Sequence, residues 1–123
     1  ERYLSEAFRA SCPEAARALR ATLLRCDAAG YAACCHAVAG VDWLDRLAQV
    51  RCPTLVIAGA LDVGAPVAMS RAIVERIEGA ELVVLQDAAH LGVLEQPVAF
   101  RAALVDLLGR VDAVVEPTPS TPA

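Results

Sequence analysis

The chain has 123 residues, of which 57% are hydrophobic and 21% are charged. This composition fits one globular domain or part of a larger one and excludes collagen-like, coiled-coil and disordered chains. The 11 basic residues, all arginines, are outnumbered by 15 acidic ones and form no stripe, so no binding of nucleic acid or anionic lipid is expected. No apolar run reaches the roughly 18 to 20 residues of a membrane-spanning helix.

The first third of the chain is predicted to be helical. Apolar residues recur at helix spacing from residue 2 to about residue 39, and Pro13 suits the first turn of a second helix, where its missing N–H costs no helical hydrogen bond. A third helix is predicted from Tyr31 to Val38. Asp42 follows and is expected to cap a short helix that runs through Leu47.

The middle of the chain changes to strand periodicity. The run Pro53–Gly59 is short, continuous and rich in β-branched residues, as is typical of a strand buried in a parallel sheet, and Glu81–Leu85 is a second candidate. A helix is predicted between them, from Pro66 to about Gly79. Four apolar residues are expected to share its buried face: Met69, Ile73, Val74 and Ile77. This order predicts a parallel βαβ unit.

The end of the chain is predicted to be one helix and a tail. Pro97 begins the helix, which is expected to end at Gly109, and the proline-rich segment from residue 116 onward predicts an extended tail or linker. Two parallel strands leave both outer edges of the sheet unpaired, so further strands are expected upstream. Since the chain also begins without Met, we interpret it as a fragment.

The cysteines indicate neither disulfides nor a structural metal. There are five, an odd number without C-x-x-C spacing: Cys12, Cys26, Cys34, Cys35 and Cys52. A reducing cytoplasm is therefore the expected location. Cys34, Cys35 and His36 are adjacent on a predicted helix, where successive side chains point about 100° apart, so they form neither a chelate nor a Cys–His pair. We expect buried, inert thiols there.

Two loops carry the candidate chemistry. Asp62 follows the first strand by three residues and His90 follows the second by five. Because the carboxyl ends of parallel strands lie at the same sheet edge, the two side chains can meet. A buried carboxylate that orients an imidazole suits general-base catalysis of attack by a nucleophile. None of the four serines lies in a G-x-S-x-G turn, so the nucleophile is expected upstream.

Each candidate also has a structural interpretation. A lone Asp after a strand is usually a turn or cap residue, and a lone loop His is usually only hydrogen-bonded; the pairing of Asp62 with His90 favours catalysis. Asp87 is a rival acid on the same loop as His90. Trp43 is a candidate substrate-binding residue, for which core packing is the alternative. Glu95 is interpreted as a capping or surface carboxylate, with support of the catalytic residues as the alternative.

Two strings of residues between Pro53 and Phe100 resemble the end of the sequences of a known enzyme family. One is Pro-Thr-Leu-Val-Ile-Ala-Gly-x-x-Asp-x-x-x-Pro, from Pro53 to Pro66, and the other is Ala-Ala-His-Leu-x-x-x-Glu-Gln-Pro-x-x-Phe, from Ala88 to Phe100. The tract from residue 30 to residue 38 is similar to a cap helix. Together they resemble the C-terminal part of α/β-hydrolases of the 3-oxoadipate enol-lactonase type.

The resemblance implies an α/β fold with three parts. Residues 1–40 would be part of a helical cap, residues 41–110 the C-terminal part of the α/β-hydrolase core with its last two parallel strands, and residues 111–123 a Pro-rich tail or linker. It also implies that Asp62 is the acid and His90 the base of a catalytic triad. No cofactor and no metal are expected in such a serine hydrolase.

The resemblance further implies hydrolysis of the enol-lactone of 3-oxoadipate, in the breakdown of aromatic compounds. A carboxylesterase or a C–C bond hydrolase shares the same strings, and a hydrolase-like binding module without catalysis is an alternative of another class. A chain without the nucleophile is expected to be inactive alone. Since some proteins of the family are fused to a 4-carboxymuconolactone decarboxylase, the tail is either a linker to such a domain or a frayed chain end.

Overall fold

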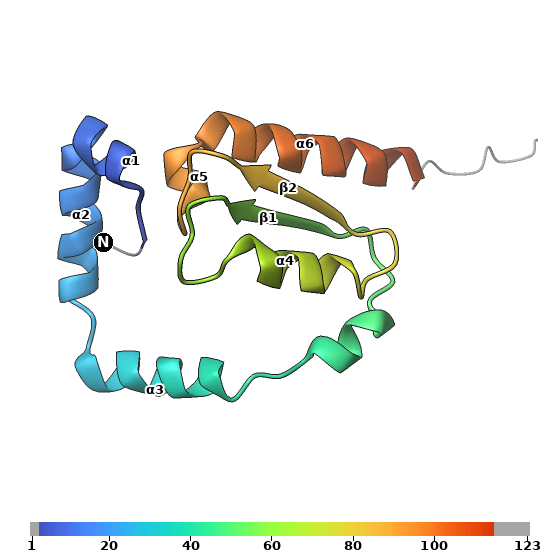
Figure 1. Cartoon of the computed structure of the whole chain (residues 1–123), viewed down its shortest axis with the longest axis horizontal. Coiled ribbons are helices and arrows are strands. Elements are labelled where there is room, and N and C mark those ends of the chain that lie inside the picture. Colours follow the sequence, from blue (N-terminus) through green and yellow to red (C-terminus); the bar gives the residue numbers. More distant parts are fainter. Residues whose placement is uncertain (1–2, 115–123) are drawn as a thin grey trace, which may run out of the picture.

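The described part of the chain is built around one pair of parallel strands. The computed structural model describes residues 3–114. Strands β1 (Leu55–Gly59) and β2 (Glu81–Leu85) pair from Leu55 opposite Glu81 to Gly59 opposite Leu85. Helix α4 (Val67–Val74) connects them, and Figure 1 shows it on one side of the sheet with α6 (Pro97–Val114) on the other. The predicted βαβ unit is therefore present.

The tightest packing lies mainly at the carboxyl ends of the two strands. Both strands are only partly covered along most of their length and become buried at their last residues. Among the described residues, six apolar side chains are buried: Leu4, Ala58, Ile77, Leu85, Ala88 and Ala89. All but Ile77 belong to the strand ends, the loop after β2 or the segment at the start of the chain. This packing fixes the loops that carry Asp62 and His90.

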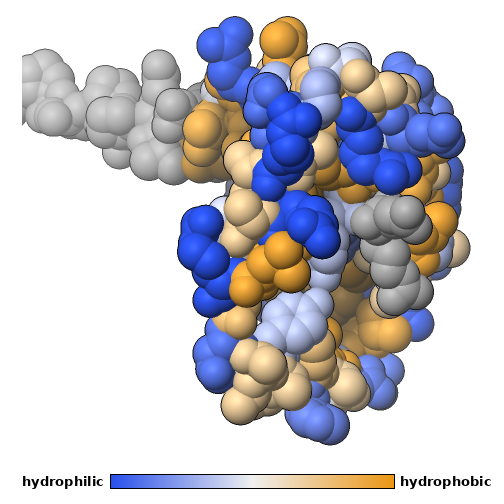
Figure 2. All heavy atoms as spheres, turned by 90° about the vertical axis from the view of Figure 1, so that its left-hand side faces the viewer, coloured by the Kyte–Doolittle hydropathy of each residue, from blue (hydrophilic) through white to orange (hydrophobic). Residues whose placement is uncertain are grey.

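Helices precede the strands in the chain, and in Figure 1 the first two lie beyond the tips of β1 and β2 while the third runs below them. These helices are α1 (Glu6–Ser11), α2 (Pro13–Leu24) and α3 (Ala28–Ala39), and the short 3₁₀ helix η1 (Leu44–Gln49) leads from them to β1. Side chains cap two of these helices, because Ser5 accepts the Phe8 N–H and Asp27 accepts the Gly30 N–H. Figure 2 shows hydrophilic and apolar residues interspersed over this side of the molecule.

Four predicted helix boundaries are wrong. Helix α4 ends at Val74, five residues before Gly79. The third helix begins at Ala28, since Asp27 caps it, and not at Tyr31. Asp42 caps no helix, because η1 follows Trp43 and has no side-chain cap. Helix α6 continues past Gly109 to Val114: an interior glycine weakens a helix by about 1 kcal/mol without ending it. Residues 111–114 of the predicted tail are thus helical, and residues 115–123 lie outside the described part.

Several side chains predicted to be buried are exposed. Met69 is 59% exposed on α4, whereas Ile77, in the turn after that helix, is buried. Cys34 and Cys35 are free and exposed on α3, and the three cysteines elsewhere in the chain are free and exposed too. Helical periodicity identifies an apolar face but not the element that covers it, which explains these errors.

Within residues 3–114, no helix combines the length and the apolar character that spanning a membrane requires.

Candidate active site

The carboxylate of Asp62 is held by three donors just beyond β1. Its backbone N–H closes the turn by donating to the Gly59 carbonyl at 3.2 Å. Oδ1 accepts the N–H groups of Gly64 at 2.8 Å and Ala65 at 3.0 Å. Oδ2 lies 2.7 Å from Nδ1 of His90. The contact between Asp62 and His90 that the loop positions predicted is therefore present.

The surroundings of Asp62 keep its carboxyl ionised. The side chain is only 6% exposed, and burial alone would raise its pKa. Donation from the Ala65 N–H, the His90 ring and the Gly64 N–H outweighs burial, so the pKa of Asp62 lies below its ordinary value. An ionised Oδ2 favours a proton on Nδ1 of His90. Nε2 of this 45% exposed side chain is then the nitrogen left for a reacting group.

Backbone contacts seat the His90 loop on the end of β1. The N–H of Ala60 donates to the Leu85 carbonyl and that of Leu61 to the Ala88 carbonyl, both at 2.9 Å. At Gly59 the two segments approach so closely that a Cβ would lie 2.0 Å from the Ala89 oxygen. Only glycine fits there. The Gly of the G-x-x-D string thus allows the loop with His90 to approach Asp62.

Tyr3 borders the Asp62–His90 pair. Its ring packs edge-on against the imidazole, with centroids 5.5 Å apart and planes at 62°. Together with Gly64 these side chains line a pocket of about 200 Å³. The Tyr3 hydroxyl lies 3.1 Å from that of Tyr31 on α3. Sequence reasoning missed both tyrosines, because no motif or periodicity marks them.

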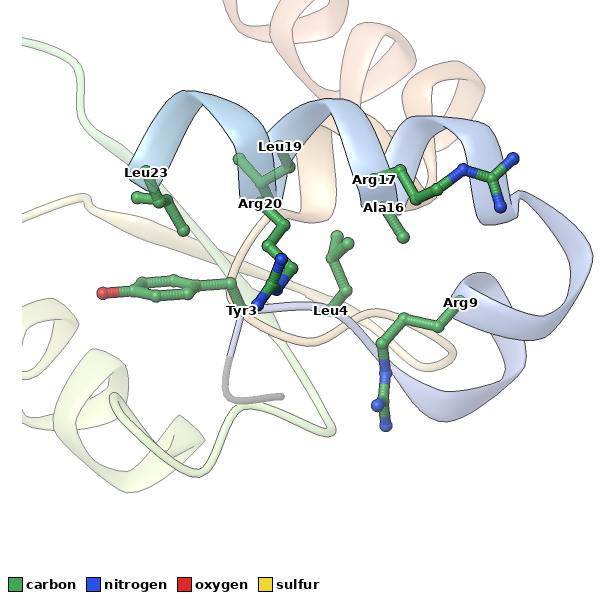
Figure 3. Close-up of a pocket in the computed structure, with 8 residues that line it drawn as sticks. All are labelled: Tyr3, Leu4, Arg9, Ala16, Arg17, Leu19, Arg20 and Leu23. Atoms are coloured by element: carbon green, nitrogen blue, oxygen red, sulfur yellow. The ribbon is translucent and has the colours of Figure 1, made fainter. Parts of the chain in front are cut away.

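Tyr3 also lines a larger cavity. Its volume is about 350 Å³, and it is lined by residues of α1, α2 and the segment before them. Figure 3 shows Leu19 and Leu23 on α2 and the long side chain of Arg20 extending toward Tyr3 and Leu4. Tyr3 therefore borders both the His90 pocket and a mostly apolar cavity with arginines on its walls.

The chain resembles hydrolases over most of its length. No family model matches it. It is 37% identical to 3-oxoadipate enol-lactonase 2 of Acinetobacter baylyi over 109 residues, which are 89% of this chain and 40% of that protein. The enol-lactonase structure from Burkholderia xenovorans superposes with a TM-score of 0.84 at 30% identity, covering 88% of this chain and 41% of that one. For a hydrolase from Pseudomonas aeruginosa the TM-score is 0.82 at 34% identity, with 88% and 40% covered.

The chain has the α/β-hydrolase fold of these proteins over the part that it matches. It matches the C-terminal part of the α/β-hydrolase fold, as the two sequence strings predicted. It spans about 40% of the length of the curated relative named above. In this α/β-hydrolase part, Asp62 and His90 occupy the loops after two adjacent parallel strands, where ligands of open α/β sheets bind.

The structure does not bring Trp43 to the Asp62–His90 pocket. Its side chain is 52% exposed, and the Arg46 guanidinium lies over its ring at 4.5 Å. Trp43 lines a groove of about 400 Å³ with residues of η1 and with Met69 of α4. Asp62 and His90 are not among the residues that line this groove. A substrate-binding role for Trp43 stays a prediction.

The rival acid and the Cys–His cluster lie apart from the site. Asp87 is exposed, and Nδ1 of His90 is bound by Asp62 instead. Cys34, Cys35 and His36 are exposed on α3. Over residues 3–114, no three His, Cys, Asp or Glu side chains are grouped as metal ligands would be.

The interpretation of Glu95 as a surface or capping carboxylate is wrong. The residue is 8% exposed and accepts two backbone N–H groups, from Ala89 at 2.8 Å and from Ser5 at 2.9 Å. It ends the short helix α5 (Gly92–Glu95), which follows the His90 loop directly. The sequence did mark Glu95, which lies five residues after His90 and two before Pro97. Its hydrogen bond with the Ser5 N–H could not be inferred from spacing.

The serines of the described part are placed unlike a nucleophile. Ser5 is buried and caps α1, Ser11 donates to the carbonyls of Ala7 and Phe8, and Ser70 lies within α4. Across residues 3–114, none of them forms a hydrogen bond with His90. The described residues thus hold an imidazole oriented by a carboxylate, and none of their serines lies within hydrogen-bond distance of it.

Proposed function

We propose that Asp62 and His90 are the acid and the base of a serine-hydrolase triad, and that the protein hydrolyses an enol-lactone of the 3-oxoadipate type. The observation that carries this proposal is the 2.7 Å contact between a buried, ionised carboxylate and Nδ1 of a half-exposed imidazole. That arrangement leaves Nε2 available to accept a proton. The names of the similar enol-lactonases support the choice of substrate class.

The first half of the proposed reaction opens the lactone ring. A serine hydroxyl from the rest of the protein attacks the lactone carbonyl while Nε2 of His90 takes its proton. The bond between the carbonyl carbon and the ring oxygen then breaks, and imidazolium returns the proton to the departing enol oxygen. Asp62 stabilises the imidazolium in between without taking a proton itself. The oxyanion donors would also come from the rest of the protein.

The second half releases the acyl group. His90 takes a proton from water, whose oxygen attacks the serine ester, and the bond to the serine oxygen breaks as the proton passes to it. The product is an enol carboxylic acid, which tautomerises to the ketone. Water is the only co-reactant, so neither step requires a cofactor.

An anionic substrate fits the larger cavity. The enol-lactone of a dicarboxylic acid keeps one free carboxylate, which needs a cation nearby. Arg20 extends from α2 toward Tyr3, the residue shared by the cavity and the His90 pocket. A guanidinium binds a carboxylate in bidentate fashion. Arg20→Gln is therefore expected to raise KM for the enol-lactone but not for a neutral aryl ester.

The test is an assay of the full-length natural protein on three substrates: an enol-lactone of 3-oxoadipate, an aryl ester, and a vinylogous diketone that a C–C bond hydrolase cleaves. We expect the enol-lactone to have the highest kcat/KM, and His90→Ala to abolish its turnover. His36→Ala is the matched control, because His36 is the other histidine of the chain and is exposed on α3.

The alternatives predict other results. Preference for the ester or the diketone would indicate a different α/β-hydrolase. Saturable binding of the lactone without turnover of any substrate would indicate a binding module. The 123-residue chain alone is expected to be inactive, since no G-x-S-x-G occurs in it. Lactone turnover by this chain that disappears with His90→Ala would contradict that expectation.

A fused C-terminal domain is a separate part of the proposal. The proline-rich segment after residue 114 suits a linker to a domain such as a carboxymuconolactone decarboxylase, while a frayed chain end is the alternative. Reading the coding sequence beyond Ala123 decides between them. About 100 or more further codons with helical periodicity would support the linker, and a stop codon within a few positions would contradict it.

A further inference from the structure

Glu95 joins two segments at opposite ends of the chain. One carboxylate oxygen accepts the N–H of Ala89 and the other accepts the N–H of Ser5, which lies 90 positions earlier. The side chain is buried, and both bonds are shorter than 3.0 Å. Bonds from N–H donors to an ionised acceptor are about twice as strong as those between neutral groups.

Both segments that Glu95 holds touch His90. Ala89 precedes His90 directly, so its N–H bond restrains the backbone from which the imidazole projects. Ser5 follows Tyr3 by two positions, and the Tyr3 ring packs against the imidazole. The Tyr3 carbonyl also accepts the Leu91 N–H at 3.1 Å. The start of the chain is therefore attached to the loop on both sides of His90.

We infer that Glu95 is a positioning residue, which orients the His90 imidazole through Ala89 and holds Tyr3 against it through Ser5. This inference rests on the proposed function, because it assigns Glu95 a part in the same reaction. Glu95 does not contact Asp62 or the reacting atoms. It acts through the backbone, as groups that support catalytic side chains commonly do.

A carboxylate suits this position and an amide does not. Each Glu95 oxygen accepts one N–H, whereas Gln has one oxygen and an NH₂ group that would face an N–H donor. Glu95→Gln therefore keeps the volume of the side chain but loses one of the two bonds. Glu78→Gln makes the same chemical change at a side chain that is 90% exposed, and is the matched control.

The first experiment compares these two variants in the full-length natural protein. We expect Glu95→Gln to lower kcat about 10- to 100-fold with a smaller change in KM, because a displacement of the base affects the chemical step more than binding. The Nδ1 proton resonance of His90, which reports its bond to Asp62, is expected to shift or broaden in Glu95→Gln only. A kcat and a proton resonance equal to those of Glu78→Gln would overturn the inference.

A second pair of variants removes the bond from its other end. Ser5 has φ −62°, which proline can adopt, so Ser5→Pro deletes the N–H that Glu95 accepts with little change in backbone conformation. Ser5→Ala is the reference, since it loses the same hydroxyl but keeps the N–H. We expect a lower kcat in Ser5→Pro than in Ser5→Ala. Equal kcat values in Ser5→Pro and Ser5→Ala would contradict the link through Ser5. This comparison stands even if Glu95→Gln does not fold.

The outcome separates this inference from the proposed function. If the wild-type protein does not hydrolyse the lactone, or if His90→Ala keeps full activity, the proposed function fails. If His90→Ala is inactive and Glu95→Gln behaves as Glu78→Gln does, only the role of Glu95 fails. The proton resonance of His90 is read without any substrate, so it tests the position of the imidazole in either case.

Discussion

The hydroxyls of Tyr3 and Tyr31 lie 3.1 Å apart, although the residues are 28 positions apart in the chain. The pKa of Tyr31 is raised to about 12, mainly by its hydrogen bond and its electrostatic interaction with Tyr3. Cys35 has a smaller effect in the same direction. We expect Tyr3→Phe to return the pKa of Tyr31 toward 10.0, and Cys35→Ala to lower it much less. Titration of the Tyr31 ring followed by ¹³C NMR measures both. If Cys35→Ala lowered the pKa of Tyr31 more than Tyr3→Phe does, the contact between the two tyrosine hydroxyls would be contradicted.

The identity of the triad acid can be tested by two matched amide substitutions. Asp62→Asn is expected to lower kcat of the full-length protein about 10,000-fold, because an amide cannot hold the His90 proton on Nδ1. Asp87→Asn changes an exposed carboxylate of the His90 loop and is expected to leave kcat within about twofold. Steady-state kinetics on the enol-lactone check both. An equally severe loss in Asp87→Asn would reverse the assignment of the acid.

The two glycines at 59 and 109 are expected to respond oppositely to alanine. A Cβ at Gly59 would lie 2.0 Å from the Ala89 oxygen, so Gly59→Ala must displace the His90 loop and lower the free energy of unfolding by about 3 kcal/mol or more. A Cβ at Gly109 meets nothing within 4 Å, and alanine there is expected to stabilise α6 by about 0.5 to 1 kcal/mol. Denaturant unfolding of the full-length protein measures both changes.

The acid stability of the protein is expected to depend on Asp62. Its pKa in the folded protein lies below the ordinary value of 3.8, so its contribution to stability is fully present above that value and is lost as the pH falls through the lower, folded pKa. Denaturant unfolding from pH 6 downward should show this loss in the wild type. In Asp62→Asn this pH-dependent loss of the free energy of unfolding should be missing. If the variant kept the pH dependence of the wild type, the loss could not be assigned to Asp62.

The Asp62–His90 pair could be predicted from sequence because strand order and loop position determine it. Each residue follows a recognisable strand at a short interval, and adjacent parallel strands bring their carboxyl ends together. The contacts of Tyr3 with His90 and of Glu95 with Ser5 could not be predicted in this way. They join the first residues of the chain to the loop after β2, and no local pattern encodes a pairing over such a distance.

Burial was predicted less well than the elements themselves. The periodicity of α3 and α4 is helical, as expected, but Cys34, Cys35 and Met69 are exposed because no described element covers their faces. The prediction that α6 ends at Gly109 was also wrong, because the helix continues to Val114. A glycine favours the end of a helix when the chain must turn there with a positive φ, and the backbone at Gly109 has no positive φ.

The bond between Ser5 and Glu95 also bears on the order in which the chain folds. The contact of Asp62 with His90 spans 28 positions, whereas that of Ser5 with Glu95 spans 90. Closing the longer loop costs about 1 kcal/mol more in chain entropy. We therefore expect the βαβ unit to bring the imidazole to its carboxylate first, and the start of the chain to attach afterwards. Docking of Tyr3 and Ser5 is then the last event in maturation of the site and the first to reverse when the native state opens.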